Sequence, residues 1–154
     1  MNYEIVTLEE KNIVGLTART ANTAPDMGSV IGGLWRQFFE NGLFSSIADK
    51  ANNFAVGLYS NYSGDAHEEY DITVGCEVTQ ISKSPTGMVK KVIPQGDYAK
   101  FVVFGDQVKA VAGAWTEIWA MPLSRSYTGD FEEYVSTDGN GNCEVHIYVA
   151  LQSK

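Results

Sequence analysis

Two adjacent glutamates, Glu132 and Glu133, lie among aromatic residues in the run Phe131-Glu132-Glu133-Tyr134. Residues 130–136 have the composition of a β-strand, in which successive side chains point to opposite faces. One glutamate must therefore share a face with an aromatic ring. A buried, ionised carboxylate is costly unless a positive partner arrives, and aromatic faces attract cations. The pattern indicates a cation site, but it leaves open which glutamate faces inward and whether both are ordinary solvated residues.

Three tryptophans lie on predicted helices. Apolar residues in 108–121 recur with a helical period and place Trp115 and Trp119 on one face. Trp35 belongs to a stronger helical pattern that ends near residues 41–42. Tryptophans on such faces form either the core or the wall of a cleft, and an indole suits both places. All three are candidate ligand contacts.

Tyrosines supply the remaining candidates. Tyr148 lies on the opposite strand face from Ile147, so it either meets solvent or lines a cleft. Tyr59 alternates with aliphatic residues in the predicted strand 54–60. Together with Tyr134, these residues complete the set of expected ligand-binding side chains.

Few other residues indicate catalysis, a metal or a cofactor. Neither His67 nor His146 has a neighbour that would form a nucleophile pair. The acidic residues of 65–71 lack the spacing and central glycine of a calcium loop. Cys76 and Cys143 lie far apart in strand-like runs, and we expect both to be buried free thiols. We therefore expect no metal and no cofactor.

The order of predicted elements repeats within the chain. The first half contains a hairpin and then a helix and two further strands, at residues 3–8, 12–18, 27–41, 54–60 and 69–78. The second half repeats this order, at residues 88–93, 98–104, 108–121, 130–136 and 144–151. The sequence thus predicts an α+β fold of tandem ββαββ modules, about 1–83 and 84–154, within a single domain. Such modules would pair into one antiparallel sheet with two main helices and a central cleft.

Composition restricts the class of partner. The 154 residues are 44% hydrophobic, enough for one core, and the net charge of −8 disfavours nucleic acid and anionic membranes as partners. A cation would be drawn to such a surface. We find no secretory signal and no apolar run long enough to span a bilayer, so we expect a cytoplasmic protein with no membrane contact.

Five segments carry a resemblance to a known family. They are residues 70–78 (YDITVGCEV), 96–101 (GDYAKF), 115–124 (WTEIWAMPLS), 131–134 (FEEY) and 147–151 (IYVAL). In this order they resemble the GyrI-like (gyrase-inhibitor-like) family, the effector-binding domain of many AraC-type and MerR-type multidrug regulators. The resemblance covers essentially the whole chain. The chain departs from the family at Ala150, where a proline is usual.

The resemblance implies a cleft for bulky, often cationic aromatic compounds, with Glu132 as the carboxylate at its base. We expect a stand-alone binding protein for amphipathic cations that senses or sequesters drugs. The family's regulators carry a helix-turn-helix before this domain, whereas here a strand begins near Met1, so we expect no direct DNA binding.

The family also suggests two alternatives. Some members are hydrolases of reactive small molecules, and Glu132 would then be a general base with Tyr134 or Tyr148 as the proton donor. Gyrase-inhibitor members act through a protein contact, so gyrase or a regulator is a possible partner.

Overall fold

A computed structural model describes residues 1–65, 67–80 and 87–153. Its elements in chain order are β1 (Glu4–Leu8), β2 (Lys11–Thr20), α1 (Met27–Glu40), α2 (Leu43–Ser46), β3 (Ala55–Ser60), β4 (Tyr70–Val78), β5 (Val89–Ile93), β6 (Gly96–Asp106), α3 (Lys109–Trp119), β7 (Asp130–Thr137) and β8 (Asn142–Ala150). This confirms the predicted α+β class and the two main helices. The module boundary expected near residues 83 and 84 lies outside the described residues.

The eight strands form one antiparallel sheet in the order β1-β6-β8-β7-β3-β4-β2-β5. This order is symmetric about the β3–β7 pair: each half contributes a three-stranded unit, β6-β8-β7 or β3-β4-β2, and the two units meet at that pair. Outside each unit lies the first strand of the other half. The duplication in the sequence is thus expressed as a two-fold repeat within a single sheet.

The predicted hairpin of the first two strands is wrong. β1 pairs with β6, at one end of the sheet, whereas β2 pairs with β4 and β5 at the other end. The two residues between these strands are Glu9 and Glu10, whereas a tight hairpin turn favours glycine or asparagine. Pairing each first strand with the other half extends the ladder to eight strands and ties the two modules together.

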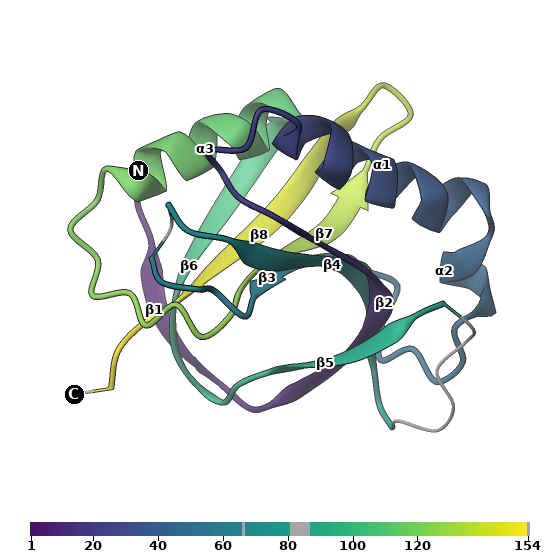
Figure 1. The fold of residues 1–154 in the computed structure, drawn as a ribbon, viewed down its shortest axis with the longest axis horizontal. Helices are drawn as coiled ribbons and strands as arrows, with labels where there is room; N and C mark the ends of the chain where they lie inside the picture. Colours follow the sequence, from purple (N-terminus) through teal and green to yellow (C-terminus); the bar gives the residue numbers. More distant parts are fainter. Residues whose placement is uncertain (66, 81–86, 154) are drawn as a thin grey trace.

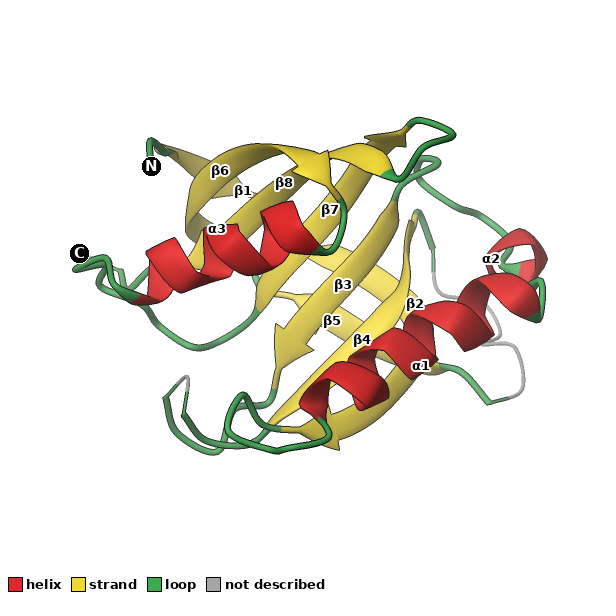
Figure 2. Ribbon diagram, turned by 90° about the horizontal axis from the view of Figure 1, so that it is seen from above, coloured by secondary structure: helices red, strands yellow, loops and turns green. Residues whose placement is uncertain are grey.

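Both long helices cover the same face of the sheet, and the sheet curls away from them (Figures 1 and 2). Apolar residues of α3 and of the strands beneath it form one core cluster, which includes Ile118 from the helix and Phe101 and Ile147 from the sheet. A second cluster joins α1 and α2 to the sheet and includes Phe38 from α1 and Val74 from β4. The amphipathic helices therefore bury their apolar stripes on one continuous sheet face.

The opposite, concave face of the sheet holds a third cluster. Ile13, Leu58, Tyr98 and Phe131 are fully buried there, and residues of β1 cover them. Gly15 lies opposite Gly75 in the β2–β4 pair, and the two backbones approach closely there. A Cβ at Gly15 would collide with the carbonyl oxygen of Val74, so glycine is needed for this approach.

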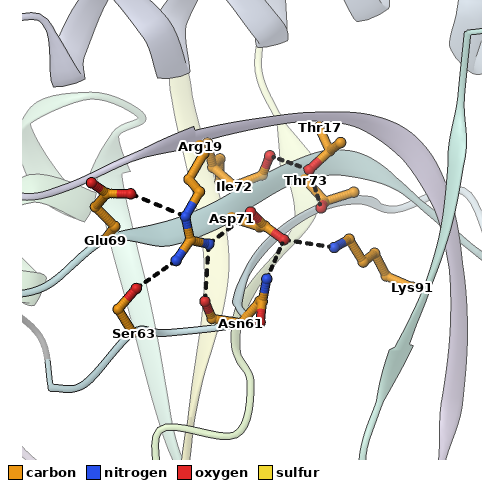
Figure 3. Close-up of polar contacts among 9 residues, drawn as sticks. All are labelled: Thr17, Arg19, Asn61, Ser63, Glu69, Asp71, Ile72, Thr73 and Lys91. Carbon is orange, nitrogen blue, oxygen red and sulfur yellow. Dashed lines mark hydrogen bonds and ion pairs between the residues drawn. The ribbon is translucent and has the colours of Figure 1, made fainter.

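An ion-pair network links three strands and a loop (Figure 3). Asp71 on β4 accepts hydrogen bonds from Arg19 Nη1 on β2 at 3.0 Å and from Lys91 Nζ on β5 at 2.9 Å. Arg19 also donates to Ser63 and Glu69, which lie in the β3–β4 loop. The network therefore fixes a strand of the second half on a strand of the first.

Candidate functional site

A pocket of about 870 Å³ lies between the two long helices and the sheet. Each helix contributes aromatic side chains to it, Trp35 and Phe39 from α1, and Trp115 and Trp119 from α3. Asp106 positions α3, because its Oδ1 accepts hydrogen bonds from the backbone N–H groups of Val108, just before the helix, and of Lys109, its first residue. The volume is within the range of small-molecule sites.

Glu132 lies at the floor of this pocket and is only 2% exposed. The structure thus decides between the adjacent glutamates, since Glu132 points toward the helices. Its Oε2 accepts hydrogen bonds from Trp115 Nε1 at 2.6 Å and from Tyr59 OH at 2.9 Å. Its Oε1 accepts one from Tyr134 OH at 3.0 Å. Four of the predicted ligand residues therefore form one contiguous cluster.

The carboxylate of Glu132 has neutral partners. Within the described part of the chain, no lysine, arginine or histidine forms an ion pair with it. Burial raises the pKa of Glu132, and the hydrogen bonds from Trp115, Tyr59 and Tyr134 oppose that rise. The pKa of Tyr134 is also raised, chiefly by burial and then by the nearby Glu132, so this tyrosine stays a neutral donor. When Glu132 is ionised, its charge therefore has no countercharge among the described residues, and a ligand could supply one.

Aromatic faces surround this carboxylate. The centre of the Trp35 ring lies 4.9 Å from the centre of the Tyr134 ring, and these two rings meet edge-on. It lies 6.1 Å from the centre of the Phe39 ring, with the two rings stacked. The Tyr59 ring meets Trp115 edge-on at 5.5 Å. Trp115 is both a core residue and a pocket residue, whereas Trp119 is 47% exposed. The arrangement combines the carboxylate and the π faces that recognise organic cations.

Tyr148 lies elsewhere. Its ring is in the concave cluster on the other face of the sheet, where it stacks on Phe131 at 4.5 Å. Strand alternation correctly separated Tyr148 from Ile147, but Ile147 is on the face beneath the helices, so Tyr148 is directed away from the pocket. Glu133 lies on the same far face, and we leave both residues out of the proposed site.

Sequence reasoning missed a second polar cluster in the pocket. Arg125, from the segment between α3 and β7, lines the pocket and donates from Nη2 to Asp130 Oδ2 at 2.6 Å. Tyr62 also lines the pocket and donates to the same oxygen at 2.7 Å. Strand alternation could have identified Asp130, since it lies two residues before Glu132. No periodicity could have identified Arg125, which lies in an irregular segment.

Metal ligands, free thiols and apolar helices are the remaining features to place within the residues that the structure describes. No group of histidine, cysteine or acidic side chains there could hold a metal ion. Cys76 and Cys143 are free and buried, as expected. In the described parts of the chain, no helix has the length and hydropathy needed to cross a membrane.

The fold and pocket define an effector-binding domain of the GyrI-like type. The family model described as "Integron-associated effector binding protein" matches residues 4–151, so the chain belongs to that family, and the resemblance seen in the sequence is confirmed. No curated protein gives a significant match.

Solved structures agree with this assignment. An integron cassette protein from Vibrio cholerae is 30% identical, with a TM-score of 0.79 over 97% of this chain and 95% of that one. SAV2435, determined bound to tetraphenylphosphonium, is 17% identical, with a TM-score of 0.76 over 97% and 94% of the two chains. The C-terminal domain of EcmrR is 15% identical, with a TM-score of 0.62 over the full length of both. The last two show likeness of fold.

Proposed function

We propose that the protein binds amphipathic, aromatic organic cations in the pocket between α1 and α3. The observation that carries this proposal is the Glu132 carboxylate, which is buried at the pocket floor and hydrogen-bonded by neutral donors alone among the described residues. A cation entering the pocket would supply the missing countercharge. A neutral molecule of the same shape would leave the carboxylate unpaired, so the site selects for positive charge.

The walls favour large, flat or multi-ring cations. Trp35 and Trp115 present indole rings from opposite helices, and Trp119 lies half-exposed beside them. A delocalised or quaternary cation loses little hydration on entering such a site, and its charge interacts with each π face. The structural relative SAV2435 has been determined with tetraphenylphosphonium bound, a ligand of this class. That observation supports the proposal by analogy of fold.

The proposed role is sensing or sequestration of such compounds in the cytoplasm. Buried free thiols at Cys76 and Cys143 suit a reducing compartment. Binding is favoured over hydrolysis because Tyr59 and Tyr134 already donate to the Glu132 carboxylate, and Tyr148, the other expected proton donor, lies on the opposite face of the sheet.

Isothermal titration with tetraphenylphosphonium, together with tryptophan fluorescence, tests the proposal. We expect saturable binding and quenching, because Trp115 donates directly to Glu132. The variant Glu132→Gln keeps the shape of the side chain and removes the charge, so affinity should fall by about 10-fold to 100-fold. Triphenylphosphine oxide, a neutral comparison ligand, should bind weakly to both proteins.

Glu133→Gln is the matched control. Glu133 is the adjacent residue and is also buried, but it lies on the opposite face of the sheet. Its substitution should leave the affinity for tetraphenylphosphonium unchanged. Equal binding by the wild type and Glu132→Gln, or no saturable binding at all, would count against the proposed function.

A further inference from the structure

We propose that Arg125 forms a second polar end of the pocket and donates a hydrogen bond to the carbonyl-type oxygen of a ligand whose positive charge is at Glu132. The ligand class is then an organic cation that carries a ketone, ester or amide group at a distance from its charge. This inference rests on the proposed function, since Glu132 holds the charged end.

Arg125 is a buried residue with hydrogen-bonding capacity left over. Its side chain is 8% exposed and lines the pocket. One guanidinium nitrogen, Nη2, donates to Asp130, while the other terminal nitrogen, Nη1, has no hydrogen-bond partner among the described residues. A donor without an acceptor is unfavourable in a largely buried side chain, so an acceptor that a ligand brings to Nη1 would be stabilised there.

The surroundings hold the guanidinium in place. Asp130 is fully buried, and its Oδ1 accepts the backbone N–H of Ala150 at 2.8 Å. The Arg125 Cζ lies 4.5 Å from the centre of the Tyr127 ring. The Arg125 backbone is fixed too, because its carbonyl accepts a hydrogen bond from Gln152 Nε2 at 3.2 Å. A site whose donor is immobilised in advance loses little entropy on binding.

The two polar ends are joined by a continuous series of aromatic rings. Successive ring centres are separated by 5.5, 5.4, 5.7 and 5.6 Å along the series Trp115, Tyr59, Tyr70, Tyr62 and Tyr127. The series begins at the indole that donates to Glu132 and ends at the ring beneath Arg125. Apolar ligand atoms between the two polar groups would lie against Tyr59, Tyr70 and Tyr62, which all line the pocket.

A neutral oxygen suits this end better than an anion. Asp130 already balances the charge of Arg125 through a 2.6 Å ion pair. A ligand carboxylate would therefore meet a second carboxylate close by and would lose hydration without gaining a free countercharge. A carbonyl oxygen accepts a hydrogen bond and adds no charge.

The test uses matched ligands. One series consists of alkyltrimethylammonium ions of increasing chain length, and the other has the same chains with one methylene near the far end replaced by a ketone. In the wild type, the ketone whose length spans the two ends should bind about tenfold more tightly than its hydrocarbon partner. Hydrophobic burial alone would give the opposite preference, because the ketone is the more polar chain.

Two variants assign the effect to its residue. Arg125→Lys keeps a positive charge beside Asp130 and removes the planar guanidinium fork, so the preference for the ketone over the hydrocarbon should disappear. Glu132→Gln should weaken both members of each pair by the same factor and leave their ratio unchanged.

A measurement on the wild type does not depend on how well a variant folds. The Arg125 Nε–Hε resonance in the ¹⁵N NMR spectrum should shift on binding the ketone and stay near its free position with the hydrocarbon. Equal affinities across the series, with the parent ions still bound, would overturn the Arg125 subsite and leave the proposed function standing. A ketone preference retained in Arg125→Lys, or an unshifted resonance, would also overturn it. Failure of every ion in the two series to bind, with tetraphenylphosphonium still bound, would also overturn the subsite, whereas failure of tetraphenylphosphonium to bind would overturn the proposed function itself.

Discussion

Gly57 lies directly opposite Glu132 across the β3–β7 pair, and a Cβ at Gly57 would lie 3.1 Å from Glu132 Oε1. The same atom would lie 3.2 Å from Cζ2 of Trp35. Glycine at this position thus leaves room at the pocket floor for a carboxylate and an indole together. The central strand pair of the sheet is also the place where the two halves of the chain form the site.

Gly57→Ala should therefore weaken binding of tetraphenylphosphonium about tenfold. The added methyl presses on a carboxylate fixed by three hydrogen bonds and on a packed indole, so at least one of them must move. Titration calorimetry measures the loss. Gly33→Ala is the control, because a Cβ there meets no atom within 4 Å and Gly33 is helical. It should leave affinity unchanged and raise stability by about 0.5–1 kcal/mol.

Affinity for a cation should depend on pH through Glu132. Burial raises the pKa of this carboxyl group, so Glu132 is protonated at low pH. A cation binds the ionised form, and at low pH its binding must therefore displace the proton from Glu132. Affinity should fall about tenfold for each pH unit below the raised pKa and be constant above it. Glu132→Gln should show a flat profile. A wild-type profile that matches the variant would contradict the assignment of the charge to Glu132.

The same group affects the stability of the empty protein. The folded pKa of Glu132 exceeds the unfolded value, so its contribution to stability is fully present below the unfolded pKa, near 4.3, and declines as pH rises through the folded pKa. Glu132→Gln removes this decline. Denaturant unfolding should show the variant to be at least as stable as the wild type at neutral pH, which separates loss of binding from loss of fold. A variant much less stable at neutral pH would contradict this account.

Asp71 should make the opposite contribution. Burial alone would raise its pKa, but hydrogen bonds from Lys91, Arg19 and Asn61 outweigh burial and lower it. The stability that Asp71 contributes is thus present above the unfolded pKa, near 3.9, and is lost as pH falls through the lowered folded pKa. Asp71→Asn should cost about 1–2 kcal/mol at neutral pH and little in strong acid. A cost that does not change with pH would contradict the role of this ion-pair network.

Much of the site could be predicted from local patterns. Helical periodicity identified α1 and α3 with their tryptophans, and strand alternation placed Glu132 and Tyr134 on one face. The pairing of β1 with β6 could not be predicted, because it joins residues far apart in the sequence and no turn chemistry marks it. Strand alternation correctly placed Tyr148 and Ile147 on opposite faces of the sheet. It could not show which of the two faces borders the pocket, because that depends on how the helices pack on the sheet.

The close approach of the β2 and β4 backbones had only a weak signal in the sequence. Gly15 and Gly75 are isolated glycines within strands, and such residues often mark a site where chains approach closely. Gly75→Ala should destabilise the protein by about 3 kcal/mol, since the new Cβ would collide with the carbonyl of Val14. Chemical denaturation measures this change. A loss below about 0.5 kcal/mol, the range of ordinary surface substitutions, would show that the sheet relaxes there.

A crystal structure of the protein with tetraphenylphosphonium tests the central claim most directly. The phosphonium centre should lie between α1 and α3, with the Glu132 carboxylate facing it and a ring of Trp35 or Trp115 within about 6 Å of the charge. Density for the ligand on the concave face beside Tyr148, or at the surface away from Glu132, would contradict a pocket in which a buried carboxylate selects a cation.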